Sequence, residues 1–211
     1  FLPFANQIYN FIAIPLIEKL PEGGNMIATE VASPFFTPFK LTLFCAIFIS
    51  FPYILYQAWS FIAPGLYKKE KRFAVPLLAT SIILFYLGIT FAYIVVFPLM
   101  FGFFTSVAPA GVEVQTDITQ FLDFVTTIVF AFGIAFEVPV ATVLVVWAGL
   151  TNVEKLGKAR PYVFLMAFIA GMFLTPPDVI SQTLLAVPVY ILYELGIIMS
   201  RIFVKKSDTS Q

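Results

Sequence analysis

The sequence predicts an all-α protein, a polytopic membrane helix bundle that forms a single integral membrane domain over residues 1–211. Three observations lead to this fold class. Hydrophobic residues make up 60% of the 211 residues and charged residues only 11%, whereas about a quarter of an ordinary soluble domain is charged. Two long runs, 41–67 and 73–112, contain no charged residue. Each exceeds the roughly 20 apolar residues that a helix needs to cross a bilayer, so lipid rather than water surrounds most of the chain.

Six membrane-spanning helices are expected in the intact protein, with the first mostly missing here. Residues 1–12 resemble the end of that first helix, because they are apolar but lack the basic start of a signal peptide. The run 73–112 would be about 60 Å long as one helix, roughly twice the membrane core, so its span should end near residue 100. The 14 residues 161–174 give only about 21 Å of helix and predict a short span. The later expected spans are 39–59, 74–100, 121–148, 162–174 and 183–203.

Prolines inside these spans predict kinked helices, because proline lacks an N–H group and its ring clashes with the preceding turn. We therefore expect a curved bundle rather than one of straight rods. The prolines concerned are Pro52, Pro76, Pro98, Pro139 and Pro188.

The basic residues predict the orientation of the chain. Ten of the twelve Lys and Arg residues fall in alternate connections and at the C-terminus, and only Lys19 and Lys40 lie on the other side. The positive-inside rule makes the basic side cytoplasmic. Both termini of the intact protein should then be cytoplasmic.

The opposite, outer side carries two features of interest. Segment 26–38 is too apolar for a free loop, and we expect it to fold as a lid of short helix anchored by Phe35 and Phe36. Thr175, Asp178 and Gln182 should form a small polar cluster on the same side. Helix capping explains Asp178 as well as a functional role does, but it leaves Gln182 without an account.

Composition also excludes several function classes. The chain has no His and a single cysteine, Cys45, which excludes Ser-His-Asp and Cys-His catalysis, disulfides and His-based zinc sites. No phosphate-binding or dinucleotide-binding motif is present. With 12 basic and 12 acidic residues the net charge is zero, which gives no reason to expect a nucleic-acid partner. We therefore expect neither an enzyme nor a bound cofactor or metal.

Glu137 and Glu194 are carboxylates that lie deep within expected spans. Glu137 is near the middle of one, where a charge costs several kcal/mol, so it marks either a pathway or partner site or a hydrogen bond that merely holds helices together. Glu194 lies about two turns before Arg201 and is close enough to the cytoplasmic interface to reach water or pair with a cation. A proton-coupled transporter of small solutes that uses Glu137 is the alternative function, although its spans offer few polar groups.

Glu70 is the single carboxylate within the basic sequence KKEKR at 68–72. It is either a solvated charge that moderates local repulsion or a carboxylate that accepts guanidinium groups in a bidentate manner, which Lys cannot match. The preceding segment 61–67 is apolar, although it lies at the interface. A ligand that carries both Arg and apolar side chains would suit this combination.

The strings MIATEVASPFFTPFK, FIAPGLYKKEKR, FEVPV and GMFLTPPDVISQTLLAVPVY, in this order, closely resemble the TatC family of the twin-arginine protein translocase. The resemblance covers nearly the whole chain, to about residue 204. It implies six helices arranged like a cupped glove, and recognition of twin-arginine signal peptides on folded cargo. It also implies work with single-span TatA-type and TatB-type subunits, powered by the proton-motive force, in a receptor complex that contains several copies of the chain.

The resemblance also implies roles for individual residues. Glu70 and Phe61 would bind the signal peptide, and a second carboxylate of that site belongs to the segment missing before residue 1. Glu137 would face the concave side, where partner helices assemble. Further residues implied at the partner-helix contact are Met172, Phe173, Thr175 and Gln182, and those implied in supporting the outer face are Pro15, Phe35, Phe36 and Asp178.

Overall fold

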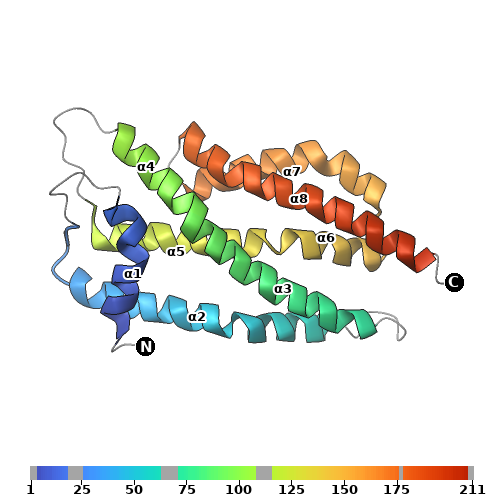
Figure 1. Ribbon diagram of the computed structural model, residues 1–211, viewed down its shortest axis with the longest axis horizontal. Coiled ribbons are helices and arrows are strands. Elements are labelled where there is room, and N and C mark those ends of the chain that lie inside the picture. Colours follow the sequence, from blue (N-terminus) through green and yellow to red (C-terminus); the bar gives the residue numbers. More distant parts are fainter. Residues whose placement is uncertain (1–3, 19–25, 63–70, 108–115, 176–177, 209–211) are drawn as a thin grey trace. The chain divides into compact units, whose positions relative to one another are not determined.

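The computed structural model describes residues 4–18, 26–62, 71–107, 116–175 and 178–208, with side chains left out at 61–62, 71–74 and 203–208. Nearly all of this part is helical (Figure 1). The elements are α1 (Ala5–Ile17), α2 (Ser33–Ile62), α3 (Lys71–Phe91), the π-helical turn η3 (Ala92–Val96), α4 (Phe97–Val107), α5 (Ile118–Ala135), α6 (Val138–Trp147), α7 (Val153–Leu174) and α8 (Val179–Asp208).

Five helical stretches are long and apolar enough to cross a membrane. They are Ser33–Ser60, Val75–Val107, Ile118–Trp147, Val153–Leu174 and Val179–Ile202. The predicted all-α membrane fold is therefore confirmed.

The chain divides into two compact units, and the first comprises Phe1–Phe51 and Thr90–Val129. In it α1 packs against α4. Its core is aromatic: Phe101 lies between Phe97 and Phe121, with ring centroids 5.7 Å from each. The ring of Tyr9 from α1 meets Phe121 edge-on at 6.1 Å, which ties α1 to the start of α5.

The second unit comprises Pro52–Ile89 and Phe130–Gln211, and in it α8 packs against both α6 and α7 (Figure 1). Trp59, Leu77, Val140 and Val143 form a buried cluster. Gly196 lets α8 approach α6 closely, because an added Cβ there would collide with the Thr142 hydroxyl.

Two helices differ from the expected spans for local reasons. α7 has 22 residues and extends beyond the expected span 162–174 at its N-terminal end, where Asn152 caps it by accepting a hydrogen bond from the Lys155 amide at 2.8 Å. The helix as a whole is about 33 Å long, but its first two turns carry Glu154, Lys155, Lys158 and Arg160, so the short apolar span at 162–174 stays a prediction. α2 begins at Ser33, with Pro34 in its first turn, where proline favours a helix start.

The expected outer lid is not formed. Residues from Ser33 onward belong to α2, so the segment does not make a separate short helix. Phe35 and Phe36 stack edge-on against each other and are 72% and 60% exposed, so neither anchors the segment in a core. Their side chains face the surroundings of the protein.

Candidate functional site

Glu137 lies at a break in a membrane-spanning helix. α5 ends at Ala135 and α6 begins at Val138, with Glu137 as its N-terminal flanking residue and Pro139 in its first turn. Pro139 lacks the N–H that would bond to the carbonyl of Ala135 in a continuous helix. The kink expected from this proline is therefore a local interruption, and it occurs directly at the carboxylate.

The Glu137 carboxyl is incompletely satisfied. Ser81 of α3, which is almost fully buried, is a hydrogen-bond partner of this side chain. The other oxygen, Oε1, is buried and has no hydrogen-bond partner among the described residues. Buried polar atoms normally have a partner, so this oxygen is a candidate for a functional contact.

Glycines bring α3 close to α5 beside this carboxyl. A Cβ at Gly88 would lie 2.5 Å from the Phe132 carbonyl oxygen, and one at Gly133 would lie 2.6 Å from the Phe85 ring. Because larger residues would force the helices apart, the two glycines hold Ser81 within reach of Glu137.

Glu194, a carboxylate in the span formed by α8, is fully paired. The Arg160 guanidinium of α7 donates from Nε and Nη2 to its two oxygens at 2.6 and 2.8 Å. Tyr190, one turn earlier on α8, also hydrogen-bonds to it. Pairing with a cation was expected for Glu194, but Arg160 could not be foreseen as that cation, because the two residues are 34 positions apart and lie on different helices. Glu194 is therefore a structural tie, and Glu137 is the candidate functional group.

The residues of the expected polar cluster lie at the end of α7 and the start of α8. Thr175 is buried at the end of α7 and donates to the Gly171 carbonyl at 2.9 Å. Asp178 caps α8 by accepting from the Ser181 amide at 2.7 Å, which supports the capping interpretation, although its Oδ2 and the Ser181 hydroxyl are buried without partners. Gln182 packs against Gly171, where an added Cβ would lie 3.5 Å from its Cα.

The apolar residues assigned to the same corner lie at its surface. Phe173 is 79% exposed and Met172 is half exposed, both in the last turn of α7. Exposed apolar side chains beside a buried polar turn form a surface on which another apolar helix could pack.

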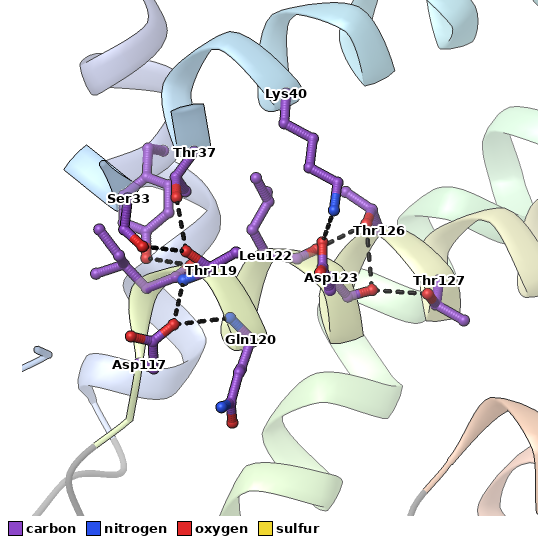
Figure 2. A network of polar contacts seen from close by, with 12 residues as sticks. Ser33, Thr37, Lys40, Asp117, Thr119, Gln120, Leu122, Asp123, Thr126 and Thr127 are labelled. Atoms are coloured by element: carbon purple, nitrogen blue, oxygen red, sulfur yellow. Dashed lines mark hydrogen bonds and ion pairs between the residues drawn. The ribbon is translucent and has the colours of Figure 1, made fainter. Parts of the chain in front are cut away.

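Figure 2 shows a polar network in the first unit that joins the start of α2 to the start of α5. Thr119 donates to the Ser33 hydroxyl at 3.0 Å, and its hydroxyl lies 3.0 Å from that of Thr37. One helical turn further along, Lys40 forms an ion pair with Asp123. We call this network, which also contains Thr29 and Asp117, the α2–α5 clasp.

Asp117 is the centre of the clasp. Its carboxylate accepts hydrogen bonds from the Thr29 hydroxyl and amide at 2.7 and 2.9 Å, and from the amides of Thr119 and Gln120 at 2.8 and 3.1 Å. The bonds from Thr29, with those from Gln120 and Thr119, hold the pKa of the Asp117 carboxyl well below its usual range. Sequence reasoning missed this residue, although Asp117 with Gln120 three positions later is a capping-box signal.

The remaining predicted residues lie elsewhere. Pro15 is buried inside α1. The backbone of Phe61 lies in the last turn of α2, and its side chain is outside the described part. Glu70 lies outside the described residues, so the expected signal-peptide site is not tested. Within the described part, no group of three or more Cys, Asp or Glu side chains could hold a metal ion.

Comparisons with known proteins give a consistent result. The model of the family described as "Sec-independent protein translocase protein (TatC)" matches residues 1–188. The TatC protein of Escherichia coli K12 is 59% identical over 96% of this chain and 79% of its own length. The TatC protein of Haemophilus influenzae is 55% identical over 98% of this chain and 81% of its own length.

Solved structures agree with the sequence relatives. A crystal structure described as the twin-arginine translocase receptor TatC superimposes with a TM-score of 0.85 at 36% identity, covering 95% of this chain and 88% of that one. A second crystal structure of the receptor, in the detergent DDM, gives a TM-score of 0.86 over 94% of this chain and 88% of the other.

Proposed function

The chain belongs to the TatC family of Sec-independent protein translocases, and from this premise we propose that it is the receptor and core subunit of a twin-arginine translocase. The match over 1–188, together with the similarity to solved twin-arginine translocase receptors, is the observation that carries the proposal. Its task is to bind twin-arginine signal peptides of folded cargo and to pass the cargo across the bacterial inner membrane at the expense of the proton-motive force. Both termini of the intact protein are cytoplasmic in this proposal.

Signal-peptide binding is assigned to Glu70 and Phe61. A carboxylate can accept two parallel N–H bonds from a guanidinium group, whereas a lysine ammonium offers only a point charge. The neighbouring cations at 68–72 favour the ionised form of Glu70 and repel ligands with a single positive charge. A pair of arginines supplies enough bidentate contacts to overcome that repulsion.

Contacts with single-span TatA-type and TatB-type helices are assigned to Glu137 and to the α7–α8 corner. The carboxyl oxygen of Glu137 that lacks a partner suits a hydrogen-bond donor on an incoming helix. At the corner, Thr175 and Gln182 supply polar groups, and Met172 and Phe173 supply apolar surface. Several copies of the chain then assemble with these subunits into the receptor complex.

The small-solute transporter is not favoured. It would require a continuous polar lining through the second unit, but the described neighbours of Glu137 on α5 and α6 are mostly apolar, with Phe136 and Val140 buried. The family relationship also favours protein translocation over solute transport.

The direct test is photo-crosslinking of a twin-arginine signal peptide to the full-length receptor in membranes. Glu70→Gln should reduce crosslinking at least about tenfold, because it removes the charge-assisted pair. A Lys-Lys peptide should bind the wild-type receptor as poorly as the Arg-Arg peptide binds the variant.

The matched control is Glu154→Gln, which removes another carboxylate from the proposed cytoplasmic side, in the first turn of α7. It should leave crosslinking unchanged. If Glu70→Gln crosslinks as well as wild type while both variants reach the membrane in equal amounts, the assignment of Glu70 is wrong.

A further inference from the structure

Pro15 leaves one backbone carbonyl of α1 without its usual hydrogen-bond donor. In an α-helix each carbonyl accepts a hydrogen bond from the amide four residues later. Proline has no amide hydrogen, so the Phe11 carbonyl loses the donor that any other residue at position 15 would supply. A backbone carbonyl without a donor is costly in an apolar environment, and proteins satisfy it from elsewhere where they can.

The replacement donor is Tyr93. Its hydroxyl donates to the Phe11 carbonyl oxygen at 2.7 Å, across 82 residues of sequence. The rings of the same two residues stack nearly parallel, with centroids 5.2 Å apart and an interplanar angle of 9°. One residue therefore holds the end of α1 through a polar and an aromatic contact at once.

Tyr93 occupies an irregular part of its own helix. It lies in the π-helical turn η3, where the Phe97 amide reaches back five residues to the Ala92 carbonyl. A π turn holds one more residue than an α turn, and so rotates the side chains on its two sides relative to each other by about 100°. The extra residue thus sets which side chain of this segment faces α1, and π turns of this kind are often found where function requires them.

We infer that Tyr93 is the positioning residue for Pro15: its hydroxyl replaces the amide hydrogen that the proline lacks and fixes α1 against the segment η3–α4. The proline, the freed carbonyl, the tyrosine and the π turn form one device in the first unit. With Pro15 but without Tyr93, the Phe11 carbonyl would have no donor. With another residue at position 15, the amide of that residue would bond to the carbonyl, and the Tyr93 hydroxyl would not be needed.

This dependence predicts a non-additive double-mutant cycle. Tyr93→Phe keeps the ring stack and removes only the hydroxyl, so it should lower the melting midpoint of the purified protein in detergent by about 2–4 °C. Pro15→Ala restores an amide that can bond to the Phe11 carbonyl. In that background Tyr93→Phe should lower the midpoint by less than half as much. An equal decrease in both backgrounds, or no decrease in the Pro15 background, would overturn the inference.

The control variant is Tyr162→Phe on α7. Tyr162 is 71% exposed and its hydroxyl has no hydrogen bond in the described part, so the midpoint should not change. This comparison separates the loss of a working hydroxyl from the general effect of removing one.

If Pro15→Ala does not accumulate, Tyr93→Phe is compared with Tyr93→Leu, which removes both the hydroxyl and the ring stack. The inference requires Tyr93→Phe to show at least half of the decrease seen with Tyr93→Leu. A wild-type midpoint for Tyr93→Phe would show that the ring alone holds α1 and would refute it. These measurements need no signal peptide, so they stand or fall independently of the proposed function.

Discussion

Replacing Glu137 and Glu194 in turn by methionine should change stability in opposite directions. Glu137→Met removes a buried oxygen that has no partner, so the free energy of unfolding should rise. Glu194→Met removes the acceptors of the two hydrogen bonds, 2.6 and 2.8 Å long, that the Arg160 guanidinium donates. The charge of Arg160 is then unpaired, so the free energy of unfolding should fall. Methionine is similar in volume to glutamate and flexible, so neither change opens a large cavity.

The magnitude for Glu137→Met follows from two contributions. Relief of an unsatisfied buried polar group is worth about 1–3 kcal/mol. The hydrogen bond to Ser81 is lost, at about 1 kcal/mol, but a serine in a helix can bond instead to the carbonyl four residues back. The net gain is about 1–2 kcal/mol, which for a chain of this size raises the melting midpoint by about 2–8 °C.

The assay is thermal unfolding of both purified variants in the same detergent, combined with export of a twin-arginine reporter in cells. We expect Glu137→Met to be more stable and yet defective in export, as is common where a strained group serves function. A lower midpoint for Glu137→Met would refute the reasoning, since it would show that the carboxyl holds helices together. A raised midpoint for Glu194→Met would contradict the role of the ion pair.

Two further predictions concern packing and the α2–α5 clasp. Gly196→Ala should lower the free energy of unfolding by about 1–3 kcal/mol, because the added Cβ would collide with Thr142. The control Gly157→Ala on α7 should not change it, because nothing lies within 4 Å of the added Cβ. Equal midpoints of the two variants in thermal melts would contradict this prediction. Asp117→Asn should destabilise at neutral pH. A carboxyl whose folded pKa is depressed contributes stability above its unfolded pKa of about 3.9 and loses it as the pH falls towards the folded value. The gap in melting midpoint between wild type and Asp117→Asn should therefore shrink from pH 7 to pH 3; a constant gap would argue against the clasp.

The fold class could be predicted because its determinants are local. Long charge-free runs such as 41–67 already indicate a membrane helix, whatever its neighbours do. Helix ends are less accessible to hydropathy: the charged first turns of α7 lie outside the apolar span expected at 162–174, although the capping signal at 151–154 indicates a helix start and Asn152 supplies the cap. Hydropathy reports where apolar residues stop, whereas capping decides where the helix begins.

Pairings across helices could not be predicted in the same way. Arg160 and Glu194 were each visible as charges, but only tertiary packing brings them together. The same holds for Thr29 and Asp117, which are 88 residues apart and meet through main-chain bonds between Ile27 and the residues beside Asp117. A single sequence does not show which distant residues meet. The capping-box signal at Asp117 indicates only a local helix start.

A proline within a helix shows in the sequence that a main-chain donor is missing, but it does not show which group the fold places nearby. Pro15 and Pro139 each remove a main-chain donor inside a helix, and of the two only Pro139 was predicted from the sequence as a kink. What differs is the group that the fold places opposite. At Pro15 a tyrosine hydroxyl supplies a donor and closes the vacancy. Two residues before Pro139, the buried Glu137 Oε1 has no hydrogen-bond partner among the described residues, so the break holds an acceptor that still lacks a donor. Such a site is stabilised by whatever brings a donor to it, and this explains in physical terms why a membrane protein would retain a carboxylate there.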